Sequence, residues 1–258
     1  MTIKTFIAVG SFFLLLYSCK PGELKTATIE NGTGLRLYEK GEYKRALYFF
    51  MKAAAHENLP DSNKAIFFAN IAHAYANIHQ ADSAKYFYKK ASEAYLPGSV
   101  NATLSMVNLF LIDEKIDSAK RYLELAYSTD SSSGEVNNLL GLIYIGDYGQ
   151  AYYNPEKAYK FNNKAFLVFR DAASKFALAK NEYFLNNVDK SITLFSQLRR
   201  ENPGNENYLV SLILIKIENG DLSNMNFLVR ELKNRFPRSY SKVISQLSVG
   251  KHAVRWNL

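Results

Sequence analysis

The sequence predicts an all-α fold in which about six helix pairs stack in series and a further helix caps the C-terminal end. Small residues recur in two columns seven positions apart, and this spacing places both columns on one face of a helix. The columns are Ala46/Ala53, Ala84/Ala91, Ala119/Ala126 and Ala158/Ala165, with steps of 38, 35 and 39 residues. They continue as Ser191/Leu198 and Met225/Leu232. A period near 34 residues is typical of stacked helical arrays, whose length is not limited by a single core.

The first repeat shows what each position contributes. Its first helix carries Gly34 to Tyr38, a turn follows at Gly41, and its second helix carries Ala46, Phe50 and Ala53. Small residues allow two helices to approach closely, and glycine relaxes the turn at little steric cost. This pattern resembles the tetratricopeptide repeat, and the resemblance implies a right-handed α-solenoid.

The next three repeats keep the pattern with one change of length. In the second, Asp61 follows Pro60 and is expected to cap the first helix. In the fourth, the extra stretch 146–153 delays the second helix, whose start is predicted by Asn154 followed by Pro155. This lengthened turn resembles that of the related Sel1-like repeat.

The fifth and sixth repeats are degenerate and close at Pro203 and Pro237, which block helix continuation. Residues 239–248 are expected to form the capping helix, because the last unit of a solenoid needs a wetter outer face. The predicted organisation is a signal peptide (1–18), a linker (19–26), the array (27–237), and the capping helix with a tail (238–258). Within the array we expect repeats at about 27–59, 60–97, 98–132, 133–170, 171–203 and 204–237.

Residues 1–19 predict export and lipidation. Lys4 precedes an apolar stretch of 12 residues that ends at Tyr17, too short for a hydrocarbon core that needs about 20. The segment Leu16-Tyr17-Ser18-Cys19 resembles a bacterial lipobox, which implies cleavage before Cys19 and attachment of lipid to its thiol. Cys19 is the only cysteine in the sequence, so it has no intramolecular disulfide partner. The alternative is an ordinary signal peptide followed by a chance cysteine.

The composition and motifs argue against catalysis. The 258 residues carry a formal charge of +8, but no nucleic-acid motif accompanies it, and we expect no nucleic-acid partner. The histidines (His56, His73, His79 and His252) have no metal-ligand spacing, and a single cysteine cannot complete a structural zinc site. No nucleophile elbow, His-Glu-x-x-His motif or phosphate-binding glycine-rich loop occurs in the sequence. We therefore expect no enzyme activity, no metal and no cofactor.

The resemblance to tetratricopeptide repeats also implies a binding groove, lined by the first helix of every pair. The groove positions of this sequence are Asn70, His73, Asn77, Asn101, Asn108, Asn138, Phe176, Lys180 and Tyr183. Asparagine is a poor helix former, so its recurrence needs a reason. The amides could pair with the backbone of a bound peptide, or they could bond between helices, and the sequence leaves both interpretations open. Lys180 is the sole cation of this set, which disfavours recognition of a C-terminal carboxylate.

Together these features predict a non-catalytic, membrane-anchored scaffold that binds a protein or peptide partner of an envelope assembly. Its expected location is the cell envelope, lipid-anchored at the outer membrane and facing the periplasm of a Gram-negative bacterium. The alternative is a glycan- or ligand-binding helical lipoprotein involved in nutrient uptake, in which tyrosines of the stretch 146–153 stack on sugar rings.

Overall fold

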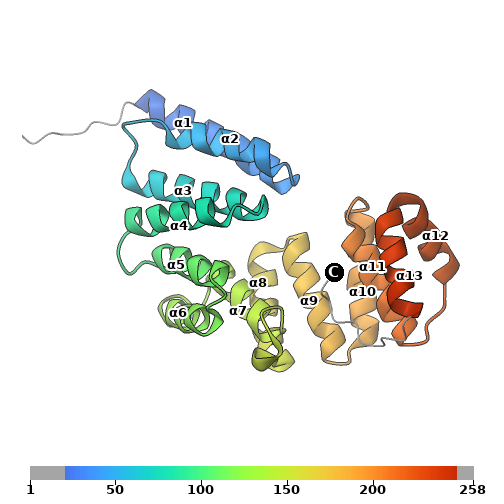
Figure 1. Ribbon diagram of the computed structural model, residues 1–258. Coiled ribbons are helices and arrows are strands. Elements are labelled where there is room, and N and C mark those ends of the chain that lie inside the picture. Colours follow the sequence, from blue (N-terminus) through green and yellow to red (C-terminus); the bar gives the residue numbers. More distant parts are fainter. Residues whose placement is uncertain (1–20, 249–258) are drawn as a thin grey trace, which may run out of the picture. The chain divides into compact units, whose positions relative to one another are not determined.

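The computed structural model describes residues 21–248, and its regular elements there are all helices (Figure 1). The α-helices are α1 (Pro21–Glu39), α2 (Tyr43–Ala54), α3 (Asp61–Asn77), α4 (Ala81–Ala94), α5 (Val100–Ile112), α6 (Ile116–Thr129), α7 (Gly134–Tyr144), α8 (Pro155–Phe169), α9 (Ala172–Phe184), α10 (Val188–Glu201), α11 (Glu206–Glu218), α12 (Met225–Arg235) and α13 (Pro237–Ser248). A short 3-10 turn, η1 (Gln150–Tyr152), lies between α7 and α8. The predicted all-α fold is confirmed. The predicted signal peptide and Cys19 lie outside the described residues.

The chain divides into two compact units, the first ending at Ile112 and the second beginning at Asp113. The first unit contains α1 to α5, and the second contains α6 to α13. Within each unit, helices that follow one another in the sequence pack on one another, as α1 does on α2 and α7 on α8. This sequential packing is the arrangement expected of a repeat array, in which each pair contacts its neighbours.

In the first unit, the alanine columns lie where the helices meet. Ala46, Ala53, Ala84 and Ala91 have no exposed surface. Helix α1 contributes a glycine to the same contacts, since a Cβ at Gly34 would lie 2.5 Å from ring atoms of Phe50 on α2. A contact this short is sterically forbidden, so Gly34 is what allows the two helices their close approach.

In the second unit, the same columns stay largely buried where the repeat is degenerate. Ser191, Leu198 and Leu232 are fully buried at their column positions in α10 and α12, whereas Met225 at the start of α12 is only partly buried. The centre of this unit is α11, where every residue from Tyr208 to Lys216 is buried. Helix α13 closes the cluster with Val243, which is 2% exposed. The structure therefore confirms a C-terminal capping helix.

Two helix starts differ from the sequence-based expectation. Helix α1 begins at Pro21, inside the range 19–26 that we expected to be a linker. Asp61, expected as the N-cap of α3, is instead its first helical residue, and Pro60 holds the cap position. Both starts place an acidic side chain in the first turn, where the helix dipole favours negative charge. The predicted start at Asn154 is confirmed, because its side chain accepts a hydrogen bond from the backbone N–H of Lys157.

The turn within each pair places one residue in the left-handed region. Gly41, Gly146 and Gly220 hold this position in three pairs, and His79 and Asn186 hold it in two others. After Gly146, the backbone N–H of Asp147 donates to the carbonyl of Leu142 over 3.2 Å. This pattern is a Schellman motif, which satisfies the last carbonyls of a helix. The motif also fixes the backbone of Asp147, the residue that follows Gly146.

Candidate functional site

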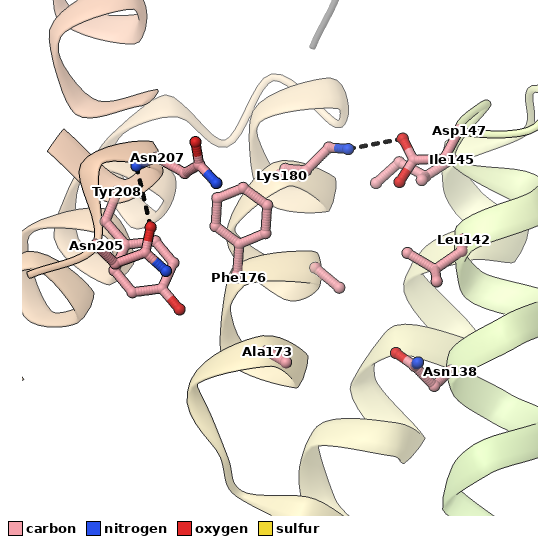
Figure 2. Close-up of a pocket in the computed structure, with 11 residues that line it drawn as sticks. Asn138, Leu142, Ile145, Asp147, Ala173, Phe176, Lys180, Asn205, Asn207 and Tyr208 are labelled. Atoms are coloured by element: carbon pink, nitrogen blue, oxygen red, sulfur yellow. Dashed lines mark hydrogen bonds and ion pairs between the residues drawn. The ribbon is translucent and has the colours of Figure 1, made fainter. Parts of the chain in front are cut away.

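The second unit contains a cavity of about 280 Å³ that opens along α7, α9 and α11 (Figure 2). These three are the first helices of consecutive pairs, the helices from which the sequence predicted a groove. A cavity of this size is slightly smaller than the sites that enclose whole small-molecule ligands, which span about 300–1,000 Å³. It has the dimensions to receive one or two side chains of a larger partner.

The floor of the cavity is apolar. Leu142 of α7 and Phe176 and Ala177 of α9 contribute to it. The Phe176 ring centre lies 5.5 Å from the ring centres of both Phe195 and Tyr208, in edge-to-face and tilted arrangements. Such aromatic pairs are worth about 0.5–1.5 kcal/mol each and favour this placement of the ring. The floor therefore offers an apolar group a preformed surface to pack on.

Two amide side chains border this floor. Asn138 projects from α7 and Asn207 from the first turn of α11 (Figure 2). Within residues 21–248, neither side-chain amide has a hydrogen-bond partner, whereas Asn205 uses its side-chain oxygen to accept from the backbone N–H of Asn207. An asparagine amide offers two donors and one acceptor oxygen, which match the groups of a peptide backbone. Asn138 and Asn207 can thus hold the main chain of a segment whose side chain enters the cavity.

The charged groups of the cavity form an ion pair. Lys180 of α9 is 5% exposed, and its Nζ lies 2.7 Å from Oδ1 of Asp147. A buried ammonium group requires such a partner, because an unpaired charge at low dielectric is costly. The cavity as a whole therefore carries no net charge.

Of the predicted groove residues in the second unit, Asn138, Phe176 and Lys180 line this cavity. Tyr183 does not, and its hydroxyl donates to the carboxylate of Glu218 on α11. Burial, together with this acceptor, raises the pKa of Tyr183 far above its usual value. Tyr183 thus links two first helices rather than facing a ligand.

In the first unit, the predicted groove residues pair mainly within the protein. Asn70 donates to Oδ1 of Asn31 on α1 over 2.8 Å, and Asn77 donates to the Tyr38 hydroxyl over 2.7 Å. These are bonds between helices of successive pairs, the second of the two interpretations that the sequence left open.

Of the remaining three predicted residues of the first unit, His73 and Asn108 also pair within the protein. Nδ1 of His73 lies within hydrogen-bond distance, 2.8 Å, of the Tyr88 hydroxyl oxygen. Asn108 donates to the carbonyl of Leu104 within α5, while Asn101 is exposed near the start of that helix.

Sequence reasoning did not predict that α11 and the lengthened turn would contribute residues to the cavity lining. Asn205, Asn207 and Tyr208 lie at the start of the sixth repeat. The pattern of that repeat is degenerate, so it did not indicate which of its residues face the groove. The Asn-x-Asn spacing ahead of an apolar run was the available signal, since asparagine is a favoured N-cap. Nothing in the sequence indicated that Asp147 would reach Lys180.

Two tyrosines of the lengthened turn contact the protein itself. The Tyr152 hydroxyl donates to Oδ1 of Asp117 on α6 over 2.7 Å. The Tyr153 ring packs edge-to-face on Phe184, with 5.7 Å between ring centres, and Tyr153 remains 39% exposed. A hydroxyl hydrogen bond and an edge-to-face contact leave ring surface open, so the sugar-stacking alternative stays a prediction.

Residues 21–248 show neither a membrane-spanning helix nor a metal-binding cluster. No helix between residues 21 and 248 is both long and apolar enough to span a bilayer. The same residues contain no cluster of three or more His, Cys, Asp or Glu side chains suited to a metal ion.

No family model and no curated protein sequence matches this chain. Solved structures match its fold. In the structure of the APC/C hetero-tetramer Cut9–Hcn1, the matching chain has a TM-score of 0.68 and 16% identity over 88% of this chain and 43% of that one. This chain therefore spans less than half the length of that neighbour.

Two further solved structures are matched over nearly their full length. PilF of Pseudomonas aeruginosa has a TM-score of 0.59 and 18% identity, with 89% of this chain and 100% of that chain covered. YrrB, described as a TPR protein with an unusual peptide-binding site, has a TM-score of 0.52 and 16% identity, with 76% and 97% covered. At these identities the likeness concerns the fold. The chain has the fold of a tetratricopeptide-repeat protein, as the sequence predicted.

Proposed function

We propose that this protein is a non-catalytic scaffold that binds a segment of a partner protein in the cavity along α7, α9 and α11. The observation that carries the proposal is the pairing of an apolar floor with two unpaired amides, Asn138 on α7 and Asn207 on α11, on either side of α9. Side-chain insertion combined with main-chain hydrogen bonding is a general mode of peptide recognition. The peptide-binding site ascribed to YrrB supports the same use of this fold.

We further propose that the scaffold is anchored in the cell envelope through a lipid on Cys19. The support is the sequence: a short apolar stretch after Lys4, a lipobox-like segment and a single cysteine. Two or more acyl chains hold a protein far more firmly than one. The likeness to PilW, described as a type IV pilus biogenesis factor, is compatible with an envelope role.

Site-specific photocrosslinking in cells tests the binding proposal. A photoreactive phenylalanine analogue replaces Ala173, an exposed residue at the cavity, in the full-length chain, so that Asn138 and Asn207 are kept. A matched variant carries it at Asn226, an exposed residue of α12 outside the cavity. We expect one partner protein crosslinked in constant ratio from position 173 and not from position 226. Equal yields from both positions, or no product from either, would refute binding at the cavity.

The anchoring proposal has its own test. Cys19→Ala should release the protein from the membrane fraction and abolish incorporation of labelled fatty acid. Retention of the variant in the membrane would contradict the proposed anchor while leaving the cavity unaffected.

A further inference from the structure

We propose that Asp147 determines the ligand class of the cavity, because it occupies the place at which a ligand carboxylate would meet Lys180. The cavity then takes an uncharged peptide segment with an apolar side chain and rejects acidic side chains. This inference rests on the proposed function and specifies the ligand of that site.

The first argument is the ion pair itself. Lys180 is the one ammonium group of the cavity lining, and it is already 2.7 Å from the Asp147 carboxylate (Figure 2). A ligand carboxylate must either displace Asp147 or approach a site that holds a like charge. The Asp147 side chain is 34% exposed, so water screens part of the repulsion, but like charges at close range still oppose binding. The pair thus removes the attraction that Lys180 would otherwise exert on an anion.

The second argument is that Asp147 is held in place without a ligand. Gly146 adopts the left-handed conformation, with φ of 91°, and the N–H of Asp147 bonds to Leu142 at the end of α7. The far end of the turn is fixed as well, because the backbone N–H of Asn154 donates to the carbonyl of Tyr144 over 2.8 Å. Displacing Asp147 therefore works against a preformed backbone rather than a loose loop.

The third argument concerns size and polarity. Apart from Lys180 and Asp147, the lining consists of apolar side chains, asparagines and Tyr208. An apolar cavity of about 150 Å³ holds a benzene molecule, so about 280 Å³ accommodates a large aliphatic or aromatic side chain. Asn138 and Asn207 supply hydrogen bonds that a neutral main chain can satisfy. The complementary ligand is an internal, uncharged segment.

Selection from a phage-displayed library of random peptides tests this inference. The peptides are fused at their C-termini, so only side chains can supply a carboxylate. Full-length native protein should enrich apolar anchor residues and deplete Asp and Glu relative to the input library. Asp147→Asn should raise the frequency of Asp and Glu among selected peptides at least tenfold over the native selection. Asp189→Asn, an equal charge change at an exposed position of α10, should select the same peptides as the native protein.

A second variant keeps the test decisive if Asp147→Asn unfolds. Lys180→Gln combined with Asp147→Asn removes both charges, and its selected peptides should remain free of acidic enrichment. Enrichment of acidic residues by the native protein, or no change in a folded Asp147→Asn variant, would overturn the inference while the crosslinking result stands. Absence of any selected peptide, together with absence of crosslinks at position 173, would overturn the proposed function as well.

Discussion

At the residue scale, a buried chain of amides joins α8 to α9 and packs against α7 in the second unit. Asn162 of α8 donates to Oδ1 of Asn181 on α9 over 2.9 Å, and Asn181 donates to the carbonyl of Pro155 over 2.8 Å. Both asparagines are fully buried. The oxygen of Asn162 lies against α7, where a Cβ built on Gly141 would be 1.8 Å away. Gly141 is therefore a packing requirement of this network.

Gly141→Ala should destabilise the second unit by about 1–3 kcal/mol, because the added methyl group must displace Asn162 or separate α7 from α8. Gly32→Ala is the matched control, since a Cβ there meets nothing within 4 Å. Gly32 lies inside α1, where alanine is favoured by about 1 kcal/mol, so this change should stabilise. Urea unfolding of both variants measures the difference, and effects of equal sign would contradict the argument.

His73 makes the stability of the first unit depend on pH. Burial lowers the pKa of His73 below its usual value. As pH falls through the range just below 7, the unfolded chain therefore takes up a proton that the folded chain does not. Stability is highest above this range and decreases with falling pH, by at most about 1.4 kcal/mol per pH unit between the two pKa values.

His73→Gln should remove this part of the pH dependence. Chemical unfolding at pH 7.5 and pH 5.5 measures the loss for the native chain and for the variant. We expect a smaller loss in the variant, and an equal loss would show that His73 does not contribute. His79→Gln, an exposed position, serves as the control for removing a histidine.

At the scale of elements, each turn within a pair needs a left-handed residue, but glycine does not always supply it. His79 has φ of 60° between α3 and α4 and makes the same hydrogen bonds as the glycine turns, with the N–H of Gln80 donating to Tyr75. The left-handed conformation costs a residue with a side chain about 1–2 kcal/mol. The repeat thus tolerates strain at a position where the sequence pattern suggested only an ordinary turn.

His79→Gly should therefore raise the stability of the first unit by up to about 1 kcal/mol, after the larger entropy loss of glycine is subtracted. His79→Ala retains the backbone strain and should give no such gain. Thermal unfolding distinguishes the two variants, and destabilisation by glycine would show that the histidine side chain stabilises the turn.

At the scale of the whole molecule, stability is divided among neighbouring helices rather than held in one core. Val243 of α13 belongs to the cluster around α11, in the second of the two compact units. In a repeat array, the loss of a contact weakens adjacent pairs first. The effect of a change at α13 should accordingly remain within the second unit.

Val243→Ala removes two buried methyl groups and should cost about 2 kcal/mol. Hydrogen exchange should show faster exchange in α11 and α12 and unchanged protection in α1 to α5. Equal acceleration throughout the chain would instead indicate that both units unfold as one.

The sequence by itself determined the all-helical repeat and the buried columns. Ala46, Ala84, Ala119 and Ala158 follow from spacing alone, because positions seven apart share a helix face whatever surrounds it. The caps at Asn154-Pro155 are equally local. In the candidate site, the resemblance to tetratricopeptide repeats also placed Asn138, Phe176 and Lys180 on the helix faces that line the cavity.

Only the tertiary structure decided which of those side chains are paired. Asn70 and Asn31 are separated by 39 residues, and Lys180 and Asp147 by 33. Whether such partners meet depends on the distance and rotation between successive helix pairs, which are set by packing across the whole interface. Spacing within a helix carries no information on these quantities, so Asn70 and Asn138 look alike in the sequence but play different parts in the fold.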